Sequence, residues 1–306
     1  MDARMLSPRD RLSQSSAALA GVAPGVSGRR ESRIAIQELV VNERGGYQFL
    51  PGVPFLSFGV VAADGFEIVR TTIRQPRPFA AGLADIERLL EASGLPLHAL
   101  CGLELRSARP LTRQEFDEFN QKYTGYLKAA GLLVGDDVPV ARTNVAFGAS
   151  GMHANGKSGA PDVRIHAWSH SRPIAPGVRA AAPTFVLAGM PEIRNLRAAG
   201  LGREPADIVA SGETTADGAP TPAALRKKTE YVLTALAQTM RTLGVEWADV
   251  TGVQFYTVHD VHPLLADLIL PRLGVAARLG VEWHHAWPPG VQLEIGVRGI
   301  RQEITA

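Results

Sequence analysis

The sequence has little of what builds secreted, membrane-spanning or nucleic-acid-binding proteins. Cys101 is its single cysteine, so no intramolecular disulfide can form and a disulfide-stapled fold is excluded. No segment approaches the roughly 20 apolar residues that span a bilayer, and the first thirty residues lack the apolar stretch of a signal peptide. The 32 basic and 30 acidic side chains give a net charge of +2 without a long basic run. We therefore expect a cytoplasmic protein that binds neither membrane nor nucleic acid.

Several catalytic signatures are also missing. There is no glycine-rich nucleotide-binding pattern, no serine nucleophile elbow and no His-Glu-x-x-His motif. The adjacent pair His284 and His285 would point to opposite faces of a strand and could not ligate one ion. We expect neither a metal nor an organic cofactor. Trp283, beside this pair, is a candidate wall of an aromatic-lined pocket, although core packing is the usual role of tryptophan.

Two parts of the chain repeat each other at an offset of 150 positions. A helical pattern ending at Gly94 leads into the strand 98–107, and a second one ending at Gly244 leads into the strand 249–258. In both copies the glycine suits the left-handed cap that ends a helix. A period this long is that of a duplicated domain and not of a solenoid repeat.

The segments on either side repeat at an offset of 130 positions. Phe55–Gly59 is similar to Phe185–Gly189, and Val163–Ile165 is similar to Leu293–Ile295. The change of offset places an early insertion at 195–222 in the second copy and a late glycine-rich loop, Gly148–Gly159, in the first. We predict a disordered N-terminal arm, two domains and a Pro/Ala-rich linker, with the bounds 1–32 for the arm, 33–172 and 183–306 for the domains and 173–182 for the linker. An organelle transit peptide is the alternative reading of the arginine-rich arm.

Each copy predicts an α+β domain in which two helices cover one face of a mixed sheet. In the first copy the helices are expected near 80–93 and 112–130, the second with Thr112 and Glu115 as a capping box. In the second copy they are expected near 222–243 and 261–273. The predicted strands are 33–42, 55–62, 66–74, 98–107, 138–148 and 162–170 in the first copy, then 184–190, 207–212, 249–258, 281–286 and 291–303. Because the other face of each sheet needs a cover, we expect assembly into a homo-oligomer, with a trimer as our structural guess.

Four short motifs resemble those of the YjgF/RidA enamine/imine deaminase family. Phe119-Asn120-Gln-Lys-Tyr123 is similar to its Phe-Asn-x-x-Tyr, and Pro139-Val-Ala-Arg142-Thr-Asn-Val145 to its Pro-x-Ala-Arg strand. Leu187-Ala-Gly189 resembles the early Ser-Gly turn, and Pro288–Ile295 resembles the closing strand with its Glu-Ile. The resemblance covers residues 33–170 and 183–304 and implies two tandem domains with the chorismate-mutase-like fold.

The resemblance also implies site residues. Arg142 matches the arginine that binds the substrate carboxylate, and Glu294 matches the glutamate that handles water or a proton. Asn120, Tyr123 and Gly189 are candidate binding residues. The second copy lacks a clear Pro-x-Ala-Arg, so Arg272 and Arg278 are both candidates for its arginine, and the first copy has Arg164 where the glutamate belongs.

These matches predict a cofactor-independent hydrolase that deaminates a small carboxylate-bearing enamine or imine. A planar guanidinium binds a carboxylate with two parallel hydrogen bonds, and one carboxyl group with a raised pKa can shuttle the protons. The substrate could be of the 2-aminoacrylate type or, as in the aminomuconate deaminases of aromatic degradation, of the aminomuconate type. Two alternatives stay open. One is a chorismatase-like hydrolase, although its Cys-Arg pair is absent, and the other is a non-catalytic carboxylate-binding protein, because neither copy holds both site residues.

Overall fold

A computed structural model describes residues 38–147, 162–175, 177 and 182–306 of the chain. The predicted disordered arm, residues 1–32, and the glycine-rich loop Gly148–Gly159 lie outside these residues. Within them, no helix is both long and apolar enough to cross a membrane.

The first sheet, sheet I, has five strands in the order β13-β4-β7-β5-β6. β5 pairs in parallel with β6 and antiparallel with β7, and β7 pairs antiparallel with β4. The chain's last strand, β13, joins the far edge in parallel with β4. The bounds are β4 Phe66–Pro78, β5 Leu100–Ser107, β6 Ala141–Ala146, β7 Val163–Pro173 and β13 Gln302–Thr305.

The second sheet, sheet II, has the strand order β1-β2-β3-β8-β12-β10-β11, and the short β9 also pairs with β12. β10 pairs in parallel with β11 and antiparallel with β12, and β12 pairs antiparallel with β8. The bounds are β1 Val40–Asn42, β2 Tyr47–Leu50, β3 Gly59–Ala62, β8 Phe185–Leu187, β9 Met190–Pro191, β10 Gly252–Tyr256, β11 Glu282–His284 and β12 Glu294–Gly299.

The two sheets share one core topology. The order β4-β7-β5-β6 in sheet I is matched by β8-β12-β10-β11 in sheet II, with the same parallel and antiparallel pairings. Both are mixed sheets, as predicted for an α+β chain. Two copies of one ancestral unit would give this arrangement.

Strands from each half extend the sheet of the other half. β1, β2 and β3 come from the first half of the chain but lie beside β8 in sheet II, and β13 from the second half lies in sheet I. The described residues accordingly fall within one compact unit. The domain bounds at 172 and 183 stay predictions, because strands from before 172 and after 183 occur together in both sheets.

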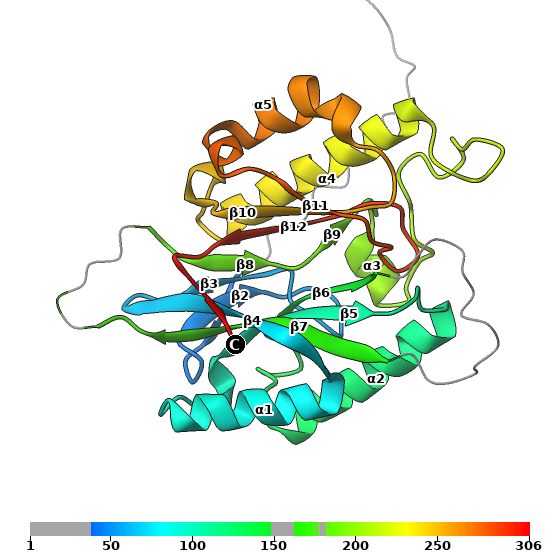
Figure 1. Ribbon diagram of the computed structural model, residues 1–306. Coiled ribbons are helices and arrows are strands. Elements are labelled where there is room, and N and C mark those ends of the chain that lie inside the picture. Colours follow the sequence, from blue (N-terminus) through cyan, green and yellow to red (C-terminus); the bar gives the residue numbers. More distant parts are fainter. Residues whose placement is uncertain (1–37, 148–161, 176, 178–181) are drawn as a thin grey trace, which may run out of the picture. The chain divides into compact units, whose positions relative to one another are not determined.

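Helices cover the outer side of each sheet (Figure 1). α1 and α2 pack on sheet I, whereas α4 and α5 pack on sheet II. The bounds are α1 Phe79–Ala92, α2 Arg113–Ala129, α3 Leu196–Gly200, α4 Pro222–Thr242 and α5 Leu270–Leu273. Short turns are η2 Leu97–Ala99, η3 Trp247–Asp249, η4 His262–Leu264, η5 Leu265–Ile269 and η6 Gly274–Leu279.

The three long helices follow the local signals of the sequence. Gly94 and Gly244 lie just beyond α1 and α4 with φ of 69° and 74°, the left-handed conformation that glycine adopts without steric cost. Thr112 and Glu115 form the predicted capping box at the start of α2. The predicted bounds of these helices are confirmed to within one residue at either end.

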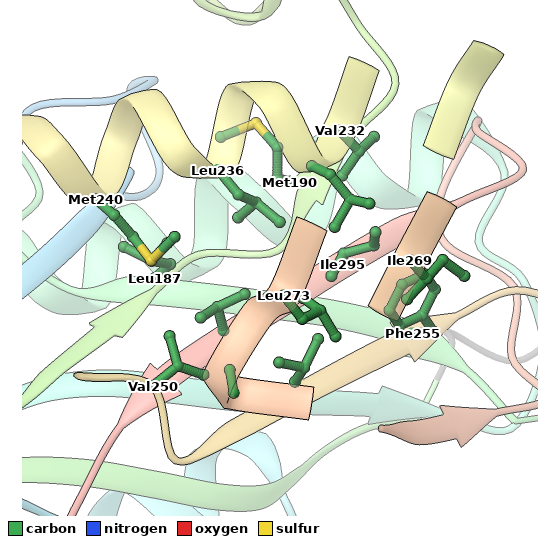
Figure 2. Close-up of a cluster of buried hydrophobic side chains, with 14 of the residues drawn as sticks. Leu187, Met190, Val232, Leu236, Met240, Val250, Phe255, Ile269, Leu273 and Ile295 are labelled. Atoms are coloured by element: carbon green, nitrogen blue, oxygen red, sulfur yellow. The ribbon is translucent and has the colours of Figure 1, made fainter. Parts of the chain in front are cut away.

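Apolar side chains fill both the helix–sheet layers and the space between the sheets. In Figure 2, Val232, Leu236 and Met240 of α4 lie over Leu187 and Ile295 of sheet II. Between the sheets a separate cluster joins buried residues of both, among them Phe49, Ile68, Cys101, Ala141 and Ile300. The single cysteine, Cys101, is thus buried between the sheets. The inner face of each sheet is therefore covered within one chain, so a sheet face in need of cover no longer argues for assembly.

Several predicted elements differ in the structure. The strand expected at 291–303 is divided between β12 in sheet II and β13 in sheet I. The helix expected at 261–273 is divided into the 3-10 turn η4, the π-helical turn η5 and the single turn α5. Pro263 and Pro271 cause this interruption because each lacks the N–H that a continuous helix needs. The strand expected at 207–212 makes only an isolated bridge between Ile193 and Ile208.

Candidate active site

A cavity of about 300 Å³ is lined by both halves of the chain. The start of α2, the strand β6 and the segment around Phe55 and Phe58 contribute from the first half. The segments 189–208 and 289–294 contribute from the second half. Arg142, Gly189 and Glu294, three of the predicted site residues, all line this cavity. Residues from the two repeated halves of the chain thus line one shared pocket.

Arg142 presents an incompletely bonded guanidinium to this cavity. Arg142 is 3% exposed, and its Nη2 donates a hydrogen bond of 2.6 Å to Oδ1 of Asn120 on α2. Its Nε and Nη1 are buried without a hydrogen-bond partner among the described residues. A buried cation that lacks hydrogen bonds is costly, and a carboxylate is the group that best satisfies such a fork.

Aromatic rings surround the same guanidinium. Its central carbon lies 4.6 Å from the ring centre of Tyr123, 5.1 Å from that of Phe55 and 5.6 Å from that of Phe119, with Phe116 at 6.0 Å. Rings at this distance stabilise a cation through their negative faces. Burial lowers the pKa of Arg142 to about 10, with Tyr123 and Glu294 opposing the shift, so the side chain remains a cation at neutral pH. The predicted residues Asn120 and Tyr123 therefore lie against Arg142 and not on the cavity wall.

Glu294 begins β12, where it pairs with Pro191 on one side and Tyr256 on the other. Burial raises the pKa of its carboxyl group to about 8; Glu192 adds to the increase, while Arg106 and Arg142 oppose it. Its Oε1 is buried without a hydrogen-bond partner among the described residues. A carboxyl group that titrates near neutral pH can both donate and accept a proton during a reaction.

Gly189 provides the space for that carboxyl group. A Cβ at this position would lie 1.8 Å from Oε1 of Glu294. The backbone N–H of Gly189 also donates to the carbonyl oxygen of Arg142 at 3.3 Å. One glycine thus links the strand that carries the arginine to the side chain of the glutamate.

Arg142 and Glu294 share the cavity without forming an ion pair. Each shifts the pKa of the other, yet no ion pair within 4.0 Å joins them among the ion pairs of the described residues. A cation and a protonatable acid that face one cavity at such a separation can act on two different groups of one small molecule.

A family model described as 2-aminomuconate deaminase CnbZ matches residues 39–304. The chain belongs to this family. It is also 34% identical over 268 residues to the 2-amino-5-chloromuconate deaminase of Comamonas testosteroni, a match that covers 87% of this chain and 98% of the relative. The resemblance to the aminomuconate deaminase type is thereby confirmed.

A solved structure from Thermotoga maritima, of a protein proposed to be an endoribonuclease, also matches in part. The two are 18% identical, with a TM-score of 0.24, over 42% of this chain and 91% of the other. A likeness this small carries no argument about activity.

The pairing of the strands shows which residue of the second copy is equivalent to Arg142. Arg142 lies opposite Leu103, whose equivalent at the offset of 150 is Val253. β11 pairs with β10 so that Glu282 lies opposite Gln254, and the preceding residue, Val281, therefore takes the arginine's place. Arg278 is exposed in η6 and Arg272 pairs with Glu230 at 3.1 Å, and neither lines the cavity.

The same comparison places Arg164 at the position of Glu294. Arg164 lies opposite Arg106 and Glu294 lies opposite Tyr256, and Arg106 and Tyr256 are themselves 150 positions apart. Arg164 is on the surface and pairs with Asp162. The second pair of equivalent positions thus has Val281 in place of the arginine and Arg164 in place of the glutamate.

Trp283 lies outside the cavity. Its side chain is 41% exposed, and its indole N–H donates to the carbonyl oxygen of Thr257 at 3.1 Å. The structure therefore separates Trp283 and Arg278 from the other five predicted residues.

Asn144 is a cavity residue that sequence reasoning missed. It lies two positions after Arg142 on β6, lines the same cavity, and its Oδ1 and Nδ2 are both buried without partners among the described residues. Side chains two apart on a strand share a face, so this period was the signal that could have identified it.

Proposed function

We propose that the chain is a hydrolase that deaminates a small carboxylate-bearing enamine or imine of the aminomuconate type. The observation that carries the proposal is the unsatisfied fork of Arg142 beside Glu294, whose carboxyl pKa is raised to about 8, in one cavity. The family description and the activity named for the Comamonas relative support the same substrate class.

Arg142 would bind the carboxylate next to the reacting carbon. Its Nε and Nη1 have no partner among the described residues, while Nη2 is held by Asn120, which fixes the orientation of the guanidinium. Because Nε and Nη1 lie on opposite sides of the guanidinium, the carboxylate would accept from one of them and from the second N–H of Nη2. These two charge-assisted hydrogen bonds would set both its position and its plane. The reacting carbon then lies at a fixed distance from Glu294, which is how positioning lowers the barrier.

Glu294 would carry the protons. In its neutral form it donates a proton to the enamine carbon, which converts C=C–NH₂ into an iminium group. As a carboxylate it then accepts a proton from the water whose oxygen bonds to the iminium carbon, the neighbouring carbon that carries the nitrogen. Glu294 would return that proton to the amino group, and the C–N bond breaks as the hydroxyl proton passes back to the carboxylate. This step releases ammonia, leaves a carbonyl group and restores the neutral Glu294, so one water is consumed for each ammonia formed. General acid–base catalysis of this kind contributes about 10²–10⁴-fold to a rate.

The lining of the cavity suits an unsaturated carbon chain. Val53, Phe58, Leu196 and Ile208 form apolar wall around the polar residues of the site. A dienoic acid such as an aminomuconate combines a flat apolar chain with carboxylates. This fit is our reason for preferring that class over the smaller 2-aminoacrylate type.

Ammonia release tests the proposal. The purified chain is incubated with 2-aminomuconate, with a 2-aminoacrylate-type substrate and with chorismate, and ammonia and ultraviolet absorbance are followed. Ammonia from aminomuconate is the expected result. Product from chorismate alone would favour a chorismatase-like hydrolase, and binding of a carboxylate without any turnover would favour a non-catalytic binding protein.

We also propose that the chain acts as a homo-oligomer, with a trimer as the expected form. The support is the exposed apolar surface near the edge strand β11, where Trp283 is 41% and Leu279 is 60% exposed. Apolar residues gathered at a sheet edge are typical of contact surfaces. Light scattering coupled to size exclusion measures the mass, and a monomer at micromolar concentration would contradict this proposal.

A further inference from the structure

Glu192 and Lys228 form an ion pair that solvent hardly reaches. Their side chains are 0% and 1% exposed, and Nζ of Lys228 lies 3.2 Å from Oε1 of Glu192. A buried pair of this kind rarely adds net stability, because both charges have lost their hydration. Its place in the fold therefore calls for another explanation.

The carboxylate of Glu192 also holds the backbone that leads into Glu294. Its Oε1 accepts a hydrogen bond of 2.8 Å from the N–H of Gln292, and its Oε2 accepts one of 3.1 Å from the N–H of Leu293. From the other side, the hydroxyl of Thr257 donates to the carbonyl oxygen of Gln292 at 2.7 Å. The two residues before Glu294 are thus fixed by side chains from two different segments.

Glu192 belongs to the same short segment as the other neighbours of Glu294. Met190 and Pro191, which form β9, pair with Ile295 and Glu294, and Gly189 lies against the glutamate carboxyl group. Lys228 reaches this segment from the first half of α4. A helix outside the cavity is thereby connected to the wall of the cavity.

We propose that Glu192, held in place by Lys228, is a positioning residue that sets where the carboxyl group of Glu294 stands in the cavity. It is not among the residues that line the cavity and acts through the backbone of Gln292 and Leu293. This inference rests on the proposed function for its catalytic consequence, but its geometry does not.

The charge of Glu192 has a second effect. The titratable groups that face Glu294 are Arg106 from β5, Arg142 from β6, Tyr256 from β10 and Glu192. The two arginines lower the pKa of Glu294, whereas Glu192 raises it in addition to burial. Glu192 therefore favours the protonated form that could act as an acid.

Two variants separate position from charge. In Glu192→Asp the charge stays but the carboxylate retreats by one methylene, so it can no longer reach both backbone N–H groups. In the double variant Glu192→Gln with Lys228→Met the pair becomes uncharged at nearly constant volume, which avoids leaving one buried charge alone. The matched control is Glu213→Gln with Lys227→Met, because Lys227, the neighbour of Lys228 on α4, pairs with Glu213 at the surface.

The measurements are kcat, KM and the titration of the Glu294 carboxyl group by carbon-13 NMR of labelled glutamate, assigned with Glu294→Gln. We expect kcat to fall by about tenfold in both variants, with KM changed by less than about twofold, since Arg142 is untouched. The Glu294 titration should move to lower pH in the double variant only. The control pair should match the wild type in all three measurements.

The inference is overturned if kcat and the Glu294 resonance of both variants match those of the wild type. A lower melting temperature with an unchanged titration and an unchanged kcat would also overturn it, because that is the result of a purely structural ion pair. Should the double variant not fold, Glu192→Asp decides through kcat and the carboxyl chemical shift of Glu294. If the wild type releases no ammonia, the proposed function fails, and the NMR titration still tests the positioning.

Discussion

Gly189 and Glu294 lie so close together that no other amino acid fits at position 189 without moving the glutamate. A Cβ there would lie 1.8 Å from Oε1, 2.3 Å from Cδ and 2.8 Å from Cγ of Glu294. All three are atoms of a side chain that can rotate, so a substitution would displace the carboxyl group before it disturbed the fold.

We therefore expect Gly189→Ala to fold and to lose activity. A displacement of about 1 Å in a catalytic group can cost on the order of 10²-fold in rate, so kcat should fall by about 10- to 100-fold. Steady-state ammonia release measures the loss, and circular dichroism checks the fold. Gly212→Ala is the matched control, because a Cβ at Gly212 meets no atom within 4 Å. Equal activity of Gly189→Ala and Gly212→Ala would remove this contact from the site.

The fork of Arg142 predicts a defect in substrate binding. In Arg142→Lys one ammonium replaces two coplanar donors, and in Arg142→Ala no donor remains. We expect KM for an aminomuconate to rise by about tenfold in the first variant and by about 100-fold or more in the second, because a charge-assisted hydrogen bond contributes about 1.5–3 kcal/mol. Arg77→Lys serves as the control, since Arg77 lies at the surface and pairs with Asp85. An unchanged KM in Arg142→Ala would rule out this role.

Asn144 predicts a conflict between stability and activity. Its two polar atoms are buried without partners among the described residues, which costs folding free energy unless a ligand supplies the hydrogen bonds. The variant Asn144→Leu has a similar volume and removes the unsatisfied groups. We expect its melting temperature to rise by a few degrees and kcat/KM to fall by about tenfold or more. A variant that is less stable and fully active would show that Asn144 has a structural role.

The sequence could predict the long helices and part of the site because those features depend on local patterns. The glycines after α1 and α4 and the capping box of α2 act within a few residues, and Arg142 and Glu294 lie in short motifs. The exchange of β1–β3 and β13 between the sheets could not be predicted, because alternation shows that a segment is a strand and does not show its partner. The ion pair of Glu192 and Lys228 could not be predicted for the same reason, since it depends on how α4 crosses β9.

The second copy shows the limit of motif matching. Arg272 and Arg278 are near the expected place in sequence, but the parallel register of β10 and β11 puts Val281 there. The irregular turns η4 to η6 lie between β10 and β11, and their length hides the equivalent position from a sequence comparison. Only the pairing of the strands fixes it. Trp283 is a candidate only because of its neighbours along the chain, whereas its side chain on the edge strand β11 is 41% exposed and does not line the cavity.

Glu294 predicts that protein stability depends on pH in a direction opposite to that of most carboxyl groups. Its pKa is about 8 in the folded chain, against an ordinary value of 4.5. Below pH 4.5 the group is protonated in both states, but between pH 4.5 and 8 only the unfolded chain releases the proton, so stability is lost as the pH rises through this window.

Glutamine cannot ionise and avoids that loss. We expect Glu294→Gln to match the wild type near pH 4.5 and to exceed it on the order of a few kcal/mol at pH 8 and above. The same variant should lose most of its kcat, together with the limb of the wild-type kcat profile that falls near pH 8. Urea unfolding across pH 4.5–9 measures the first effect, with Glu118→Gln as an exposed control whose stability should follow the wild type. A constant difference between Glu294→Gln and the wild type over this range would mean that Glu294 titrates as an ordinary carboxyl group, and its role as a proton donor at neutral pH would then fail.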